Sequence, residues 1–206
     1  RDLFVGLRED VSHALSNMPV NTEVKDKILS YGERMSTRIL EAKCLQEGLQ
    51  AVVVDAFEII ETDDNFGEAR PDFESTKAKT IRRIHPLLKK GIMPIITGFI
   101  GATKDGRITT LGRGGSDYTA SILGWALDAK EVWIWTDVNG VFTNDPNKDK
   151  TAKFISKMRF DEADAMAKNG AKVLYAKTLE PLFGTVIVVR VKNTFNPSFK
   201  GTEISN

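Results

Sequence analysis

The 206-residue sequence has one cysteine, Cys44, and two histidines, His13 and His85. A single cysteine excludes a disulfide within the chain and is typical of a reducing compartment, so we expect a cytoplasmic protein. Cys44 lies in an apolar helical stretch and is expected to be a small buried hydrophobic residue rather than a nucleophile. The histidines lack the spacing of metal ligands, which disfavours a histidine metal site.

Long hydrophobic runs and an excess of one charge are also lacking. No apolar run approaches the ~20 residues that cross a membrane, and no signal peptide is visible, so we expect no membrane association. Lys and Arg number 29 against 28 Asp and Glu, and this balance disfavours nucleic acid as a partner. The hydrophobic fraction of 41% is that of an ordinary core, in one domain or two closely joined lobes.

Apolar periodicity predicts alternating helices and strands. Helical spacing covers residues 1–18, 22–46 (one helix or two, around Tyr31-Gly32), 74–90, 116–129, 160–169 and 177–183, and strands are expected at 51–54, 92–100, 108–111, 131–135 and 185–191. This alternation predicts an α/β fold with a mainly parallel sheet sandwiched between helices. Trp125, Trp133 and Trp135 are expected to fill the core rather than to stack on bases.

The most informative segment is residues 110–120, where three glycines, Arg113 and the pair Ser116-Asp117 precede a predicted helix. Glycines let backbone N–H groups approach a ligand, and a helix N-terminus adds partial positive charge. Arg113 can bind a carboxylate with two hydrogen bonds. The segment therefore predicts a site for a carboxylate or phosphate. The alternative is a tight loop in which Ser116 caps the helix and Asp117 complements its dipole.

Residues 112–118 resemble the Gly-Arg-Gly-Gly-Ser-Asp-Tyr segment of aspartokinases, in the amino-acid kinase superfamily. Further similar segments follow in the family's order at residues 31–37, 63–66, 97–101, 135–142, 170–174 and 191–197. No single segment would suffice, but the ordered set is specific. The resemblance implies the carbamate kinase-like fold of that superfamily, with an amino-acid-substrate lobe at 1–110 and a nucleotide-binding lobe at 111–206.

The resemblance also implies an activity and the residues that perform it. The expected reaction is ATP-dependent phosphorylation of the L-aspartate side chain to 4-phospho-L-aspartate, which leads to lysine, threonine and methionine, by a homo-oligomeric enzyme. Glu33 would contact the substrate ammonium, Arg113 the α-carboxylate, and Ser116 would add a hydrogen bond. Asp117 would organise catalysis by orienting a lysine and the acceptor. On the residues alone, Glu33 is also explained as a first-turn carboxylate that stabilises a helix.

The expected nucleotide site begins where Thr136 and Asp137 end a strand, because ligands in open α/β sheets lie beyond strand C-termini. The resemblance adds four contacts to ATP: Phe142, at a position that is commonly tyrosine, Asn147, Lys172 and Val173. Asn147 replaces a phosphate-contacting arginine of the family, and whether Lys148 takes over its role stays open. Mg²⁺ would enter only on the ATP phosphates, without a metal site in the chain.

Two family features do not occur in the sequence: the Lys-x-Gly-Gly-Thr stretch, whose lysine stabilises the transferring phosphoryl group, and the paired regulatory ACT domains. The chain is therefore expected to be the central and C-terminal part of a catalytic domain, incomplete at its N-terminus and inactive alone. A non-catalytic binding module and a kinase for another amino acid or for carbamate stay open as alternatives. The Glu33 segment and residues 193–197 favour aspartate.

Overall fold

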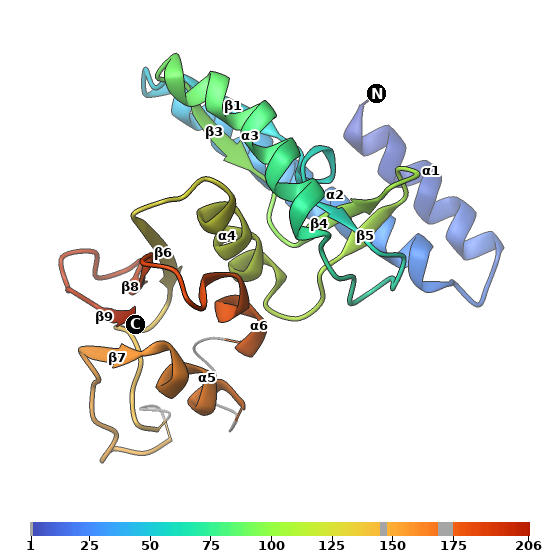
Figure 1. Cartoon of the computed structure of the whole chain (residues 1–206). Helices are drawn as coiled ribbons and strands as arrows, with labels where there is room; N and C mark the ends of the chain where they lie inside the picture. The colour runs from blue at the N-terminus through green and yellow to red at the C-terminus, as the bar shows by residue number, and fades with distance from the viewer. Residues whose placement is uncertain (1, 145–147, 169–174) are drawn as a thin grey trace. The chain divides into compact units, whose positions relative to one another are not determined.

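The computed structural model describes residues 2–144, 148–168 and 175–206 (Figure 1). The chain divides into two compact units, Arg1–Ser116 and Asp117–Asn206. None of the described helices is long and apolar enough to cross a lipid bilayer.

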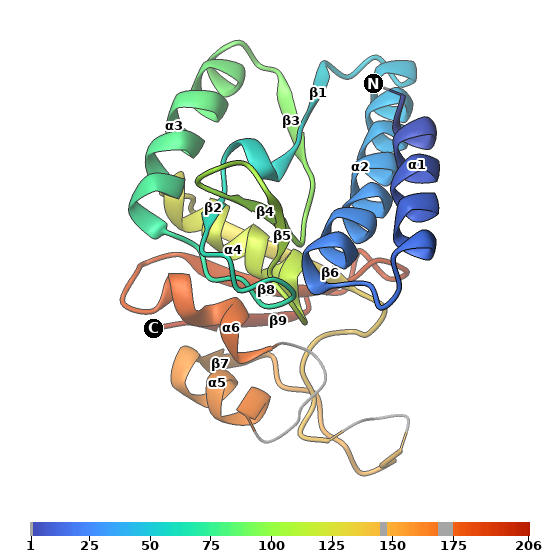
Figure 2. The same cartoon turned by 90° about the vertical axis from the view of Figure 1, so that its right-hand side faces the viewer.

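The helices of the first unit are α1 (Leu3–Ser16), α2 (Thr22–Gln46) and α3 (Phe73–Lys89). Each begins after a residue whose side chain accepts a backbone N–H of the first turn, namely Asp2, Asn21 and Asp72. Figure 2 shows α1 and α2 side by side on one flank of this unit and α3 on the opposite side of strands β1 and β3. The 22–46 segment is one helix, and Cys44 within it is buried as expected.

The strands of the first unit form two small sheets. In the first sheet, β1 (Ala51–Val54) pairs in parallel with β3 (Met93–Ile96). In the second sheet, the central strand is β4 (Ile100–Thr103), which pairs in parallel with β2 (Glu61–Thr62) and antiparallel with β5 (Ile108–Thr110). A short 3₁₀ helix, η1 (Ala56–Glu58), follows β1. The expectation of one strand over 92–100 is wrong, because Phe99 adopts a left-handed φ of 70° and turns the chain between β3 and β4.

The second unit contains α4 (Gly115–Ala126), which begins at the boundary between the units. It also contains a four-stranded sheet in the order β6 (Glu131–Thr136), β8 (Val188–Asn193), β9 (Thr202–Ser205) and β7 (Lys157–Arg159). The β6–β8 and β7–β9 pairs are parallel and β8–β9 is antiparallel. Helices α5 (Phe160–Lys168) and α6 (Ala176–Leu179) and the 3₁₀ helix η2 (Glu180–Leu182) connect β7 to β8. β7 and β9 were not predicted from the sequence.

The core of the second unit lies on one face of this sheet. Alternation along β6 buries Val132 and Ile134, which pack with side chains of α5, η2, β8 and β9. Trp125 packs against this core, as predicted. The prediction is wrong for Trp133 and Trp135, which point to the opposite face and are 47% and 46% exposed, with the Lys192 ammonium over both rings.

Candidate active site

Glu33 lies in the middle of α2, eleven residues after Thr22 begins the helix. Its interpretation as a first-turn carboxylate is therefore wrong, since the dipole effect falls off within the first turn. The helix continues through Gly32, whose surroundings are open, at a cost of about 1 kcal/mol relative to alanine. The Glu33 carbonyl accepts hydrogen bonds from the hydroxyls of Ser36 (3.1 Å) and Thr37 (3.0 Å).

The Glu33 carboxylate is half-buried, and burial raises its pKa above the ordinary glutamate value. Within the described part of the chain, no cationic or hydrogen-bonding side chain compensates this loss of solvation. A carboxylate in this state binds a cation favourably, because the cation replaces the solvation that burial has removed.

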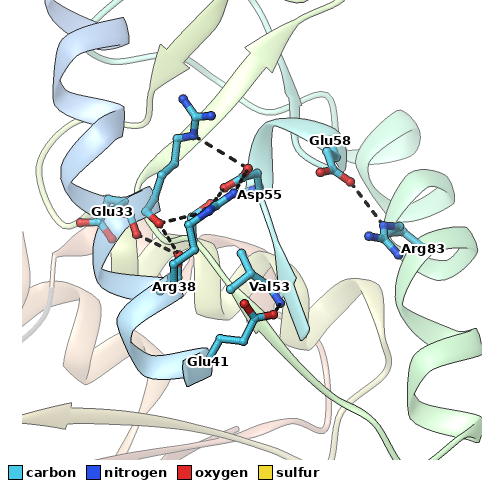
Figure 3. A network of polar contacts seen from close by, with 11 residues as sticks. Glu33, Arg38, Glu41, Val53, Asp55, Glu58 and Arg83 are labelled. Atoms are coloured by element: carbon cyan, nitrogen blue, oxygen red, sulfur yellow. Dashed lines mark hydrogen bonds and ion pairs between the residues drawn. The ribbon is translucent and has the colours of Figure 1, made fainter. Parts of the chain in front are cut away.

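The turn of α2 that carries Glu33 is fixed to the end of β1 by an ionic network (Figure 3). Asp55 is buried directly after β1 and accepts two hydrogen bonds from Arg38, at 3.0 and 2.8 Å, which raise the pKa of that guanidinium. Arg34 Nε lies 3.8 Å from Asp55, and its guanidinium is within 5.3 Å of the Tyr31 and Phe57 ring centroids. No role was predicted for these residues from the sequence, where Asp55 stands out only as an aspartate directly after a buried strand.

The loop before α4 requires its glycines. Gly112 and Gly114 adopt left-handed φ values of 77° and 73°, and Gly115 N donates to Gly112 O at 3.0 Å. A Cβ on Gly112 would lie 3.1 Å from Gly67 O. The loop presents Arg113 at the protein surface. The left-handed glycines and the close contact with Gly67 show a tightly packed loop, and the predicted approach of this backbone and of Arg113 to a ligand stays a prediction.

Ser116 lies beside the turn between β3 and β4. A Cβ on Gly98 would come within 2.9 Å of Ser116 Oγ, and a Cβ on Gly115 within 2.8 Å of the Phe99 ring. Thr97 Oγ1 accepts the Ala56 N–H at 2.7 Å and holds this turn against η1. The strained Phe99 backbone is therefore held between two elements, an arrangement that is common at functional sites.

Asp117 lies in the first turn of α4 and is half-buried. Burial raises its pKa, although a helix N-terminus by itself favours the ionised form. No cationic side chain among the described residues offsets this burial. Asp117 thus resembles Glu33 in being a carboxylate that a bound cation would stabilise.

The expected nucleotide residues of the second unit lie where two parallel strands end. Thr136 at the end of β6 pairs with Asn193 at the end of β8, and Thr194 N donates to Thr136 O at 2.8 Å. Thr136 Oγ1 donates to the exposed Asp137 carboxylate at 3.1 Å. Asn193 Nδ2 donates to Asn139 Oδ1 at 2.8 Å, which adds two polar side chains that the sequence analysis did not assign.

Phe142 follows this edge and is half-buried. Its ring packs edge-on against Phe154, with centroids 5.7 Å apart, and Phe154 packs in the same way against Phe199 at 5.0 Å. Lys148 is exposed. The three other predicted nucleotide contacts, Asn147, Lys172 and Val173, lie outside the described residues, so their convergence with Thr136 and Asp137 stays a prediction.

Metal-binding side chains are not grouped in the described part of the chain, which has no set of three or more His, Cys, Asp or Glu placed to hold an ion. The candidate residues of the first unit are the half-buried Glu33, the exposed Arg113 and the close-packed glycine backbone beside it.

Comparisons with known proteins extend this description. The model of the amino acid kinase family matches residues 6–193. The chain is 39% identical to lysine-sensitive aspartokinase 3 of Escherichia coli (strain K12) over 209 residues, covering 97% of this chain and 46% of that protein. It is 42% identical to the chloroplastic aspartokinase 1 of Arabidopsis thaliana over 186 residues, covering 88% and 32%.

The fold agrees with a solved structure. The crystal structure of E. coli aspartokinase III in complex with aspartate and ADP matches with a TM-score of 0.94 at 38% identity, covering 99% of this chain and 45% of that chain. This confirms the predicted fold class. The chain spans less than half the length of these relatives. Because the family model matches most of the 206 residues and the fold agrees with it, the chain belongs to the amino acid kinase family.

Proposed function

We propose that the gene product containing this chain uses ATP to phosphorylate the side-chain carboxylate of L-aspartate, forming 4-phospho-L-aspartate and ADP. The observation that carries the proposal is the half-buried Glu33 carboxylate, which has a raised pKa and no compensating cation in the described residues. Such a group suits the ammonium of an amino acid. The similarity to a structure that contains aspartate and ADP supports aspartate as the acceptor and an adenine nucleotide as the second ligand.

The acceptor amino acid is bound by the first unit in this proposal. Glu33 binds the ammonium and Arg113 the α-carboxylate, so the two charged groups at the α-carbon are recognised by opposite charges. Ser116 adds a hydrogen bond. The side-chain carboxylate of the substrate is then left to react, and it is already nucleophilic at neutral pH, so the protein needs to position it rather than to activate it.

Asp117 organises the reacting groups rather than neutralising them, because it is itself an anion. Its raised pKa indicates that it gains from a nearby cation, and we assign it the task of holding a lysine ammonium beside the acceptor. Positive charge between the two reacting anions lowers their repulsion in the transition state.

The nucleotide is bound by the second unit at the C-terminal end of β6. Thr136 and Asp137 contact ribose or phosphates and Phe142 contacts the base, with Asn147, Lys172 and Val173 completing the set. ATP supplies the phosphoryl group and carries Mg²⁺ on its phosphates. The parallel β6–β8 pair supports this placement, because strand C-termini are where open α/β sheets bind ligands. The active protein is proposed to be a homo-oligomer, and its product to enter lysine, threonine and methionine synthesis.

A coupled assay tests the proposal. The gene product is incubated with Mg-ATP and either L-aspartate, L-glutamate or carbamate, and ADP release is followed. Hydroxylamine is added in parallel, because it converts an acyl phosphate to a hydroxamate and thus separates carboxylate phosphorylation from ATP hydrolysis. We expect ADP and hydroxamate in equal amounts with aspartate. ADP release without hydroxamate, or equal rates with all three acceptors, would contradict the proposal.

A further inference from the structure

Asp26 is a buried carboxylate of α2, 1% exposed, that does not belong to the residues assigned above. It accepts three hydrogen bonds from residues far away in sequence. Its Oδ2 accepts the backbone N–H groups of Gly67 and Thr110, both at 2.8 Å, and its Oδ1 accepts the Thr110 hydroxyl at 2.9 Å. One side chain therefore joins a helix, a loop and the end of a strand.

The loop that Asp26 binds, residues 63–70, contains the family-like segment 63–66, for which no role was assigned. Asp63 N donates to Arg70 O at 3.0 Å and so closes the loop on itself. Gly67 is packed closely on two sides. A Cβ added to Gly67 would lie 3.1 Å from the side chain of Thr22 in α2, and a Cβ added to Gly112 would lie 3.1 Å from the Gly67 carbonyl oxygen. The loop thus forms a layer between α2 and the glycine-rich loop.

Both ends of this connection lead to the proposed acceptor site. Thr110 ends β5 and lies three residues before Arg113. Asp26 lies seven residues before Glu33 on α2, which is about two helical turns, so the two carboxylates share one face about 10 Å apart along the axis. A shift of α2 against β5 would change the distance between the groups proposed to bind the ammonium and the α-carboxylate.

We propose that Asp26 is a positioning residue that sets the spacing between Glu33 and Arg113, and thereby the affinity for the amino-acid acceptor. The inference rests on the proposed function. Asp26 does not touch the substrate, and it acts through the backbone of Gly67 and Thr110. Three donors converge on it, and its two oxygens accept all of them.

The decisive variant is Asp26→Glu in the gene product containing this chain. It keeps the charge and both acceptor oxygens but adds one methylene, or about 1.5 Å, between the helix and the loop. Displacements of about 1 Å can cost a hundredfold in well-positioned sites, so we expect the KM for aspartate to rise at least tenfold. The KM for ATP should change less than about twofold, because the altered contacts lie in the acceptor part.

Two further variants separate positioning from stability. Asp26→Asn preserves the shape, and a flipped amide can still accept two N–H groups and donate to the Thr110 hydroxyl, so the KM for aspartate should stay within about threefold of the parent. Asp10→Asn removes a charge from another α2 contact, since Asp10 accepts from Lys27 and the Tyr31 hydroxyl, both at 2.7 Å. That variant should lower the melting temperature and leave the KM for aspartate unchanged.

The outcomes distinguish the two proposals. If the parent protein does not phosphorylate aspartate, the proposed function fails. If it does, and Asp26→Glu is folded with an unchanged KM for aspartate, the positioning role is refuted. An equal rise of both KM values in Asp26→Glu, or the same rise in the destabilised Asp10→Asn, would likewise overturn it. Calorimetric titration of aspartate into each variant gives the same comparison without turnover.

Discussion

Replacing Glu33 by glutamine is the most direct test of the acceptor site. The substitution removes the charge while keeping the size of the side chain. In the proposed complex Glu33 binds the substrate ammonium, so its contribution should appear only with ligands that carry an ammonium. Succinate is the matched ligand, because it has both carboxylates of aspartate and no amino group. Comparing the affinities of the parent and Glu33→Gln for aspartate and for succinate is a double-mutant cycle, and it isolates the interaction of Glu33 with the ammonium group.

The size of the effect follows from the burial of Glu33. Hydrogen bonds to charged groups contribute about 1.5–3 kcal/mol, and the half-buried position favours the lower part of that range because solvent screens the pair. About 1.4 kcal/mol corresponds to tenfold in affinity, so the parent should prefer aspartate over succinate by roughly tenfold to thirtyfold. In Glu33→Gln the preference should fall to within about threefold, with succinate affinity nearly unchanged.

The raised pKa of Glu33 adds a pH dependence with a defined sign. The protonated carboxyl binds an ammonium poorly. As the pH is lowered, the affinity for aspartate should therefore begin to fall at a higher pH than it would with a glutamate of ordinary pKa. In the unliganded protein the folded pKa exceeds the unfolded one, so the contribution of Glu33 to stability is present at low pH and is lost as pH rises through its folded pKa. Glu33→Gln should therefore raise the melting temperature at neutral pH.

Calorimetric titration and thermal unfolding of the gene product containing this chain measure both effects. Glu47→Gln is the control, since Glu47 caps the C-terminal end of the same helix and pairs at the surface with Lys43. It should change neither ligand preference nor its pH profile. Equal weakening of aspartate and succinate by Glu33→Gln would refute the ammonium assignment and indicate a structural role instead.

Three further predictions concern other parts of the site. Arg113→Ala should raise the KM for aspartate by roughly tenfold to a hundredfold and that for ATP much less, and an unchanged aspartate KM in steady-state kinetics would contradict the carboxylate role. Gly98→Ala should lower kcat/KM because its Cβ would lie 2.9 Å from Ser116 Oγ. The control Gly32→Ala, in open space within α2, should raise the free energy of unfolding by about 1 kcal/mol and keep activity. Equal activity of the two variants in the same assay would argue against a role for the Gly98 turn. Asp137→Asn should weaken ATP binding and spare aspartate binding in paired titrations, and the reverse pattern would remove Asp137 from the nucleotide site.

The sequence predicted the features that depend on local periodicity or on glycine chemistry. Helices with clear apolar spacing and a capping residue, such as α3 after Asp72, were found within one or two residues. The glycines before α4 were expected to form a turn, either as part of an anion site or as a tight loop alone, and the left-handed φ values of Gly112 and Gly114 agree with a turn. In these cases the information lies within a few neighbouring residues.

The features that were missed depend on tertiary contacts. Residues 92–100 have the composition of one strand, and only the left-handed backbone of Phe99 divides it. Trp133 and Trp135 were expected in the core from their size, but alternation with Val132 and Ile134 places them on the opposite face of β6. Asp26 gave no signal, because its three donors lie 41 and 84 residues away.

The hydrogen-bond partners of the carboxylates in the first unit support the assignment of Glu33 to ligand binding. Asp26 receives three hydrogen bonds and Asp55 a bidentate arginine, so the protein itself satisfies these two buried carboxylates, neither of which is proposed to touch a ligand. Glu33 lies on the helix between these two anchors and is partly desolvated without such a partner among the described residues. A unit that stabilises Asp26 and Asp55 and leaves Glu33 uncompensated loses stability at Glu33, and binding a cation recovers it. This coupling explains in physical terms why the site would select an amino acid over a dicarboxylic acid of the same length.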